Sequence, residues 1–300
     1  MTPVFSIDFQ KVPPEAAVVP VMDRGFLYGD SVYEVVRTYR GKIPFLLDRH
    51  YRRLLHSAEQ IGLRIPFSFE RLDRHLVDCM VGSPHPDHYI RIIVSRGEDD
   101  RFDLYPQEKL VPRTVILVDR IKVFPKEYYE SGVGVALVSI RRNPRQALDP
   151  NIKSGNYLNN VIAIIEAKKR GAADAVMLNV EDCIAEATAS NIFMVKGGVI
   201  QTPQMESGIL DGISRGLLKE IFHRERIPFE ERRISRQEFL SADEVFLTGT
   251  VKEIMPVATI DGVSVGSGKP GTVTGRVIEQ FRKEVERIVS SRGPGSSRTT

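Results

Sequence analysis

Apolar and polar positions alternate along several short stretches of the chain, with turn residues between them, and this spacing predicts β-strands. In the first part of the chain, the pattern predicts a hairpin over 31–47 and strands over 89–97 and 113–123. Apolar residues spaced three and four apart predict two helices, over 48–62 with Asp48 as its cap and over 68–80 with Ser68 as its cap. The first 122 residues are therefore expected to form a small α+β domain.

Strands and helices continue after a connecting segment, 123–131, that separates the first domain from a second one over 132–292. The strands expected there cover 133–142, 174–179, 183–188, 191–203 and 244–250. The helices expected there cover 156–171, the residues after 216, and 272–291. The Gly/Ser-rich tail, 293–300, is expected to be disordered.

Composition excludes several classes of partner. The chain has 300 residues with 42% hydrophobic and 27% charged content, as in ordinary globular proteins. Its 42 Lys and Arg nearly balance 39 Asp and Glu, which gives no electrostatic case for nucleic acid or an anionic membrane. No apolar run reaches the ~20 residues that span a bilayer, and no secretory signal begins the chain. The six histidines lack metal-ligand spacing, so no metal site is expected.

The two cysteines bear on the cellular compartment. Cys79 and Cys183 lie far apart in the sequence and form no CxxC pair. We expect both to be buried thiols in a reducing environment, which together with the missing signal favours a cytoplasmic location.

Lys153 is the first candidate for chemistry. In "NIKSGNY" it stands between a turn and an apolar helical pattern, among small polar residues that leave room for a ligand. A lysine becomes a nucleophile when desolvation or nearby cations make its neutral amine accessible. The alternative is an ordinary surface lysine in front of a helix.

Glu186 is the second candidate. It lies in "CIAEAT", a strand of otherwise apolar and small residues, where a carboxylate is costly without a partner. A protonated ring nitrogen of a ligand would be one such partner. An ion pair with one of the many arginines would be another.

Two glycine-containing segments suggest a site for a phosphate. "LDGISRG" places a glycine, an isoleucine and a serine at the start of a helix, where backbone N–H groups lack acceptors. "FLTGT" ends a strand with two threonines around a glycine, and Arg53 can add positive charge from the first domain. A lysine nucleophile, a buried acid and phosphate ligands are the parts that bound pyridoxal phosphate requires.

At these residues the sequence resembles a known family, the class IV (fold type IV) pyridoxal-phosphate aminotransferases. The resemblance runs from about residue 5 to 290 in six blocks that follow one another in order. They are "DRGFLYGDSVYEVVR", "DRHYRRLLHSA", "IKSGNYLNN", "IAEATASNIF", "GILDGISRG" and "EVFLTGTVKEIMPV". The resemblance implies an α+β fold of two α/β domains, with the cofactor site between them and the second domain as the cofactor-binding one.

The resemblance also assigns roles to single residues. Lys153 matches the Schiff-base lysine, which would carry a proton between substrate and cofactor, and Glu186 matches the acid at the ring nitrogen. Arg53, rather than the neighbouring Arg52, matches the phosphate-binding arginine, and Tyr157 resembles the tyrosine at the ring hydroxyl. The other cofactor contacts that it implies are Leu210, Gly212, Ile213, Ser214, Gly249 and Thr250.

The amino acid that would be transaminated is less clear, because the resemblance is mixed. Tyr89 and Arg91 resemble the Tyr-x-Arg of branched-chain enzymes, whereas Tyr33 in "VYEVVR" resembles the D-amino acid group. Arg101 matches the arginine of an Arg-x-His pair in D-amino acid enzymes, but Asp103 replaces the histidine. Arg101 can also be a solvated loop charge paired with neighbouring aspartates.

The remaining substrate contacts that the resemblance implies are Tyr28, Thr250 and Val251. We favour branched-chain L-amino acids with 2-oxoglutarate, with a D-amino acid aminotransferase as the alternative. An aminodeoxychorismate lyase is less favoured because Val35 stands where that enzyme would have threonine. A non-catalytic cofactor-binding protein is also less favoured, because Lys153 and Glu186 are both present. The family further implies a homodimer or a multiple of dimers.

Overall fold

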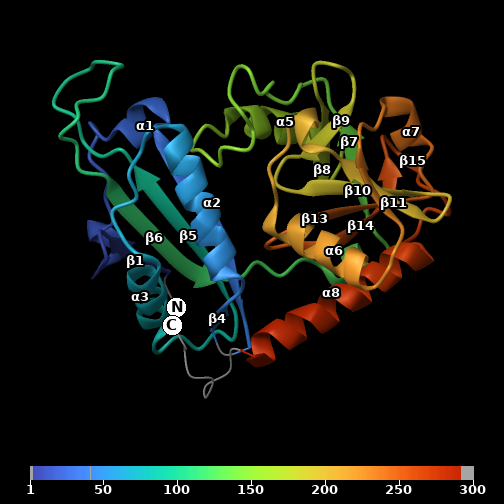
Figure 1. The fold of residues 1–300 in the computed structure, drawn as a ribbon, viewed down its shortest axis with the longest axis horizontal. Coiled ribbons are helices and arrows are strands. Elements are labelled where there is room, and N and C mark those ends of the chain that lie inside the picture. Colours follow the sequence, from blue (N-terminus) through green and yellow to red (C-terminus); the bar gives the residue numbers. More distant parts are fainter. Residues whose placement is uncertain (1–2, 41, 292–300) are drawn as a thin grey trace. The chain divides into compact units, whose positions relative to one another are not determined.

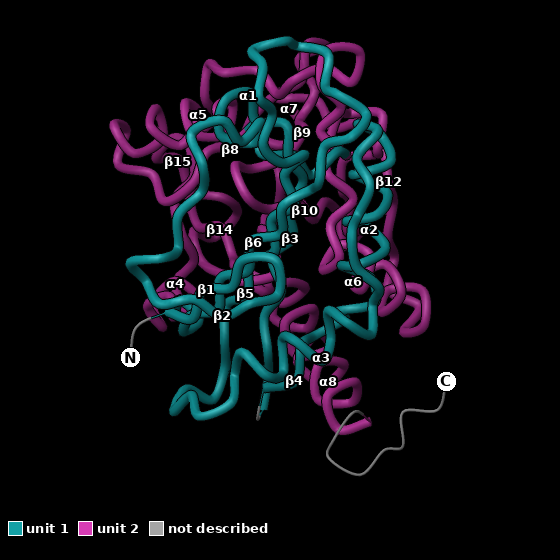
Figure 2. The backbone as a smooth tube through the Cα atoms, turned by 90° about the vertical axis from the view of Figure 1, so that its left-hand side faces the viewer, with its two compact units in different colours: residues 1–122, 152–156, 292–300 teal, residues 123–151, 157–291 magenta. Residues whose placement is uncertain are grey.

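The computed structural model describes residues 3–40 and 42–291, and contacts between residues divide them into two compact units (Figure 2). Unit 1 contains the chain up to Lys122 together with Ile152–Asn156, and unit 2 contains Val123–Asn151 and Tyr157–Ser291. The short segment with Lys153 therefore belongs to unit 1, although the chain around it builds unit 2. The tail expected to be disordered, 293–300, lies outside the described residues.

Unit 1 is built on a six-stranded antiparallel sheet with the order β2-β1-β6-β5-β3-β4. Its strands are β1 (Val4–Ile7), β2 (Gln10–Val12), β3 (Ser31–Tyr39), β4 (Ile43–Pro44), β5 (His88–Ser95) and β6 (Arg113–Arg120). Its helices are the 3-10 turn η1 (Pro14–Ala16), α1 (Arg24–Tyr28), α2 (Leu47–Gln60) and α3 (Phe69–Met80). The hairpin and both longer helices of the first domain were expected at these places.

The two faces of this sheet differ in chemistry because side chains alternate along each strand. Val32 and Val36 of β3 face the core with Ile90 and Ile92 of β5, where α2 and α3 cover the sheet (Figure 1). The residues between them, such as Tyr33, point to the opposite face. The helices thus bury one apolar face and leave a face with tyrosines and arginines.

The start of α2 differs from the sequence-based expectation. Its cap position is Leu46, which has a φ of 52° and makes no side-chain capping hydrogen bond, whereas Asp48 lies within the first turn. Asp48 still stabilises this end of the helix, because its negative charge is attracted to the positive end of the helix dipole. Ser68 does cap α3, since its hydroxyl accepts a hydrogen bond from the backbone N–H of Arg71 at 3.3 Å.

Unit 2 is built on a mixed nine-stranded sheet with the order β12-β11-β10-β13-β14-β7-β8-β9, to which β15 adds on β14. Its strands are β7 (Val133–Leu137), β8 (Asp174–Leu178), β9 (Ile184–Ala187), β10 (Asn191–Lys196), β11 (Val199–Pro203), β12 (Phe229–Arg232), β13 (Glu244–Gly249), β14 (Glu253–Ile260) and β15 (Val263–Ser264). The single strand expected over 191–203 is in fact two, because Gly197 and Gly198 adopt positive φ and turn the chain.

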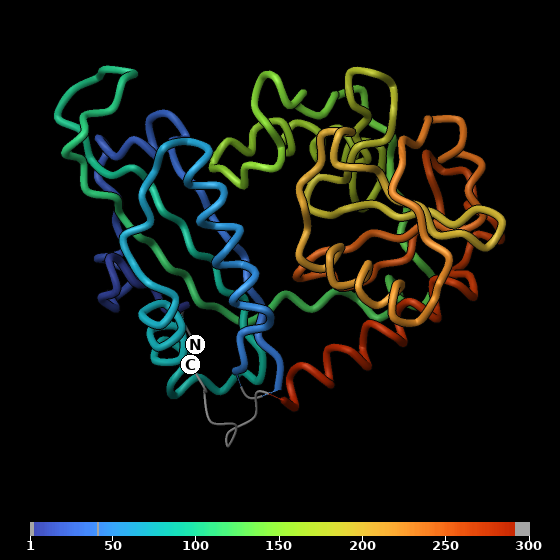
Figure 3. Tube along the Cα trace, viewed as in Figure 1, coloured from blue at the N-terminus to red at the C-terminus, as the bar shows by residue number. Residues whose placement is uncertain are grey.

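The helices of unit 2 are α4 (Lys126–Glu130), α5 (Leu158–Lys169), α6 (Ile213–Arg224), α7 (Arg236–Leu240) and α8 (Thr272–Ser291), with the 3-10 turn η2 (Met205–Ser207). Ala163 and Ala167 of α5 pack on β7 and β8. The long helix α8, red in Figure 3, packs against α6, β13 and β14. Within the described residues, no helix is both long and apolar enough to cross a membrane.

Candidate active site

Lys153 is held by backbone contacts to the start of β3. Its carbonyl accepts a hydrogen bond from the N–H of Tyr33 at 2.9 Å, and its own N–H donates to Ser57 Oγ of α2 at 3.1 Å. The next residue, Ser154, forms an antiparallel bridge with Val32. One strand and one helix of unit 1 therefore fix the backbone from which the lysine side chain projects.

Glycine is needed on both sides of this contact. A Cβ on Gly155 would lie 2.3 Å from Ser31 Oγ, and one on Gly29, whose φ is +67°, would lie 2.7 Å from Asn156 Oδ1. Asn156 Nδ2 also donates to the carbonyl of Gly29 at 3.1 Å. The small residues after the lysine thus let its segment approach β3 closely, in addition to leaving room for a ligand.

The amine of Lys153 lies against Tyr33. Its Nζ donates to the Tyr33 hydroxyl at 3.3 Å and stands 4.4 Å from the ring centroid, while the guanidinium carbon of Arg91 is 4.5 Å from the same centroid. Arg91 Nε is buried with no hydrogen-bond partner among the described residues. Three predicted site residues are thus brought together, on the sheet face opposite the core.

Arg53 is part of a buried charged cluster. Its Nε and Nη2 donate to the two carboxylate oxygens of Glu34 at 2.7 and 2.8 Å, and His50 Nδ1 donates to Glu34 Oε2 at 2.7 Å. Burial alone would raise the pKa of Glu34, but Arg53 and His50 together hold this pKa well below its ordinary value of 4.5. Burial lowers the pKa of His50 below 6.5, against the opposite influence of Glu34. Arg52, in contrast, is exposed and pairs with Asp48.

In unit 2, Glu186 has the arginine partner that was considered as an alternative. Arg142 Nε donates to Glu186 Oε1 at 2.8 Å, and both side chains are buried. Arg142 Nη1 also donates to Asn159 Oδ1 at 3.0 Å, at the start of α5. Sequence reasoning missed Arg142, whose only local signal is an arginine pair followed by Asn-Pro. The ion pair accounts for a carboxylate inside an apolar strand.

Asn191, also missed, joins Glu186 to the segment before α6. Its Nδ2 donates to the Leu210 carbonyl at 2.8 Å, and the N–H of Leu210 donates to Glu186 Oε2 at 3.0 Å. A Cβ on Gly212 would lie 2.0 Å from Asn191 Oδ1, so the chain approaches this amide as only glycine allows. These contacts fix the entry into α6.

The N-terminus of α6 lies beside the end of β13. Gly212 is the cap residue and makes no side-chain capping bond, and the first N–H groups of a helix have no acceptor within it. Thr248 pairs with Asn191 across the sheet, and its buried Oγ1 has no partner in the described part of the chain. Backbone N–H groups, the Ser214 hydroxyl and this orphaned hydroxyl are donors of the kind that a phosphate accepts.

The other predicted residues are placed as follows. Tyr157 is the cap residue of α5 in unit 2, and Thr250 and Val251 form the turn after β13. Tyr89 lies on β5 two residues before Arg91 and shares its face.

Tyr28 is the last residue of α1, just before β3, and its hydroxyl donates to the carbonyl of Phe102, the neighbour of Arg101, at 3.2 Å. Arg101 is about half exposed and lies near Asp100 and Asp103, at 3.9 and 3.6 Å. Buried Arg24 holds this loop by donating to the carbonyls of Asp103 and Leu104 at 2.7 and 2.6 Å. The position of the loop is thus set, although its charged tip is solvated.

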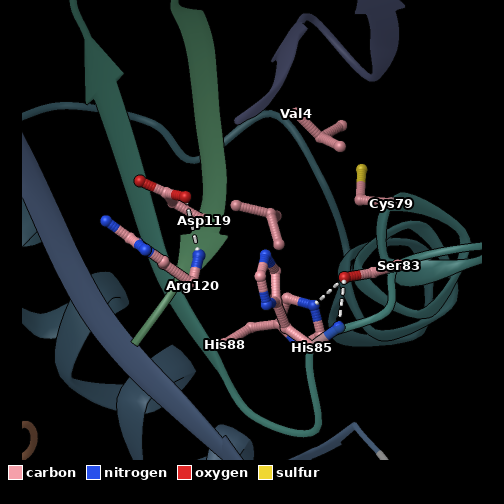
Figure 4. Close-up of a pocket in the computed structure, with 8 residues that line it drawn as sticks. Val4, Cys79, Ser83, His85, His88, Asp119 and Arg120 are labelled. Carbon is pink, nitrogen blue, oxygen red and sulfur yellow. Dashed lines mark hydrogen bonds between the residues drawn. The ribbon is translucent and has the colours of Figure 1, made fainter. Parts of the chain in front are cut away.

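A pocket lies at the start of β5, beside His88 (Figure 4). It contains none of the candidate site residues named above. It is lined by Val4, Cys79, Ser83, His85, His88, Val118, Asp119 and Arg120. His88 Nε2 contacts Ser83 Oγ at 2.7 Å. Among the described residues, no group of three or more His, Cys, Asp or Glu is arranged to hold a metal ion. Cys79 is buried as expected, whereas Cys183 is only partly buried; neither forms a disulfide.

Comparison with known proteins defines the family. Residues 31–260 match the model of amino-transferase class IV. A "Putative branched-chain-amino-acid aminotransferase" of Methanocaldococcus jannaschii is 35% identical over 271 residues, covering 90% of this chain and 92% of that protein. A D-alanine aminotransferase of Staphylococcus epidermidis is 35% identical over 286 residues, covering 95% and 99%.

A solved structure agrees with this likeness. The branched-chain amino acid aminotransferase of Thermobaculum terrenum in its PLP form superimposes with a TM-score of 0.85, at 28% identity, over 95% of this chain and 94% of that one. The chain belongs to the class IV aminotransferase family, and its α+β fold is that of fold type IV. It is a transaminase, with relatives named for branched-chain and for D-amino acids at nearly equal identity.

Proposed function

We propose that this transaminase uses pyridoxal 5'-phosphate and moves the amino group of a branched-chain L-amino acid to 2-oxoglutarate. The observation that carries the proposal is that Lys153 and Arg91 both contact Tyr33. An amine nucleophile and an arginine whose buried Nε has no partner among the described residues suit an amino acid, which brings a reacting carbon and a carboxylate.

The residues present fit the cofactor. In unit 1, Lys153 would hold its aldehyde carbon and Arg53 its phosphate. In unit 2, the phosphate ligands would be Gly212, Ile213, Ser214, Gly249 and Thr250, with Leu210 against the ring and Tyr157 at the ring hydroxyl. Bound pyridoxal phosphate supplies the electron sink for the substrate's α-carbon.

The protein supplies the proton transfers. Lys153 would take a proton from the substrate α-carbon as a general base and would deliver it, as a general acid, to the carbon that was the cofactor's aldehyde. Glu186, fixed by Arg142 and by the N–H of Leu210, would accept a hydrogen bond from the ring nitrogen and favour its protonated form. The amino group would stay on the bound cofactor when the first keto acid is released and would then pass to the second keto acid, so two half-reactions share one site.

The choice of L-amino acids rests on the two arginines. Arg91 lies within reach of the ring that contacts Lys153, whereas Arg101 pairs with acidic neighbours on an exposed loop of the same chain. The alternative, a D-amino acid aminotransferase, draws support from the D-alanine aminotransferases among the relatives and from that same Arg101. Val35 on β3, in place of a threonine, keeps the lyase reaction less favoured.

A panel of half-reactions tests the proposal. The cofactor-loaded protein is mixed separately with L-leucine, L-glutamate, D-alanine and D-glutamate, and loss of its visible absorption is followed. We expect L-leucine and L-glutamate to react faster than either D-amino acid. Faster reaction with D-alanine would favour the alternative, and no reaction with any amine would favour a non-catalytic protein.

We also propose a cytoplasmic homodimer or a multiple of it. In support, α5 exposes an apolar stripe of Leu158, Val161, Ile162 and Ile165, spaced as one face of a helix. A stripe of this kind can pair with its own copy about a two-fold axis. The two free thiols suit a reducing compartment. Light scattering at assay concentration tests the assembly, and an active monomer would overturn it.

A further inference from the structure

The cluster of Glu34, His50 and Arg53 lies where β3 meets α2. The side chains of Glu34 and His50 are 1% and 2% exposed, and that of Arg53 is 9% exposed. Glu34 accepts two hydrogen bonds from Arg53 and one from His50, so its carboxylate is satisfied by these two residues. Such paired donation fixes the plane of a guanidinium as well as its position.

The same two elements hold Lys153. His50, Arg53 and Ser57 lie on one face of α2, because they are spaced three and four residues apart. Ser57 accepts the N–H of Lys153, and Tyr33, the neighbour of Glu34, donates to its carbonyl. β3 and one face of α2 therefore fix the backbone positions from which the side chains of Lys153 and Arg53 project.

Stability alone is a weak reason to keep this cluster. Removing two charges from water is costly, and a well-packed apolar pair of similar volume is often at least as stable. Glu34 pairs with Arg53 through Nε and Nη2, and pairing through two of its three nitrogens also fixes the direction of the third.

We propose that Glu34 is a positioning residue for the cofactor phosphate, which holds Arg53 in the orientation that meets this group, with His50 fixing the carboxylate. The inference rests on the proposed use of pyridoxal phosphate. Glu34 touches neither substrate nor cofactor and acts through Arg53.

Binding of two ligands to the apoprotein tests the role. Pyridoxal 5'-phosphate and pyridoxal differ only in the phosphate. A residue that acts through Arg53 on the phosphate therefore changes the affinity for pyridoxal phosphate and not that for pyridoxal. We expect Glu34→Gln to weaken pyridoxal phosphate binding at least about tenfold, by equilibrium dialysis, and to change pyridoxal binding less than about twofold. Equal weakening of both ligands would assign Glu34 to folding alone.

A double-mutant comparison separates action through Arg53 from a direct effect. In an Arg53→Gln background, Glu34→Gln should add less than about twofold, because the group that it positions is gone. Additive losses would overturn the proposal. The matched control is Asp48→Asn, which removes the carboxylate of the exposed pair with Arg52 on the same helix and should leave both affinities unchanged.

Two further outcomes have defined meanings. If Glu34→Gln fails to fold, Glu34→Asp and Arg53→Lys replace it, since each keeps its charge but loses the paired geometry. If neither variant changes the ratio of the affinities for pyridoxal phosphate and pyridoxal, the role of Glu34 is refuted. If the wild-type apoprotein binds neither ligand, the proposed use of the cofactor fails, which is distinct from a failure of Glu34.

Discussion

The hydroxyl of Tyr33 accepts a hydrogen bond from Lys153 Nζ at 3.3 Å, and the backbone N–H of the same tyrosine donates to the Lys153 carbonyl at 2.9 Å. Tyr33 therefore holds the lysine at both its backbone and its amine. The contact joins residues 120 positions apart. It lies within unit 1 because the short segment with Lys153, Ile152–Asn156, belongs to that unit.

Removal of the Tyr33 hydroxyl should slow the proton transfers. Tyr33→Phe keeps the ring but takes away the acceptor that orients the amine, and a hydrogen bond to a charged group is worth about 1.5–3 kcal/mol. We expect a roughly tenfold slower single-turnover reaction with L-leucine. Tyr39→Phe, the same change on the same strand beside Phe45, is the control and should react at the wild-type rate. Equal rates for wild type and Tyr33→Phe would show that the hydroxyl is dispensable.

Glu186→Gln should keep the fold and lower the single-turnover rate by about a hundredfold or more. A neutral amide does not stabilise a protonated ring nitrogen. Its NH2 group would also replace an oxygen that accepts a hydrogen bond from Arg142 or from the N–H of Leu210, so two donors would face each other. Stopped-flow absorbance measures the rate. Glu181→Gln, which breaks an exposed pair with Arg233, is the matched control. Near-native rates in Glu186→Gln would make the carboxylate structural.

Arg142 shows what sequence reasoning does not reach. Both longer helices of the first domain and several strands could be predicted because turn residues and periodicity are local signals, and family motifs led to the hypotheses on Lys153 and Glu186. The pairing of Arg142 with Glu186 spans 44 positions and depends on how β7 and β9 lie in the sheet. The cap expected for α2, Asp48, was wrong, because the cap position is taken by Leu46, which is buried and makes no side-chain capping hydrogen bond.

Substrate choice should separate Arg91 from Arg101. If Arg91 binds a substrate carboxylate, Arg91→Ala should reduce activity with L-glutamate about ten- to a hundredfold, whereas Arg101→Ala should change the L-leucine reaction little. Steady-state kinetics with L-leucine, L-glutamate and D-alanine measure both variants. Wild-type preference for D-alanine that disappears in Arg101→Ala would reverse the assignment.

The stability of β3 should depend on His50 between neutral and mildly acidic pH. Burial lowers the pKa of His50 in the folded state below its ordinary 6.5, so the unfolded state binds more protons as the pH falls through that value. Stability is therefore complete above about pH 6.5 and declines on acidification. The low pKa of Glu34 adds a further loss below about pH 4.5, where the unfolded carboxyl takes up protons.

Hydrogen exchange of the β3 amides measures this local stability at pH 5.5 and pH 7.5, after correction for the intrinsic exchange rates. His50→Gln, which keeps a donor for Glu34 but does not titrate, should reduce the difference in protection between the two pH values. An equal difference in wild type and variant would contradict the role of His50.

We propose that Lys153 is the residue that reacts with the cofactor. Borohydride reduction of the protein loaded with pyridoxal phosphate, followed by proteolysis and mass spectrometry, identifies the modified residue directly. We expect one cofactor adduct, on Lys153, and none in Lys153→Ala, although that variant should still bind pyridoxal phosphate reversibly through its phosphate ligands. An adduct on a different lysine, formed equally in Lys153→Ala, would contradict it.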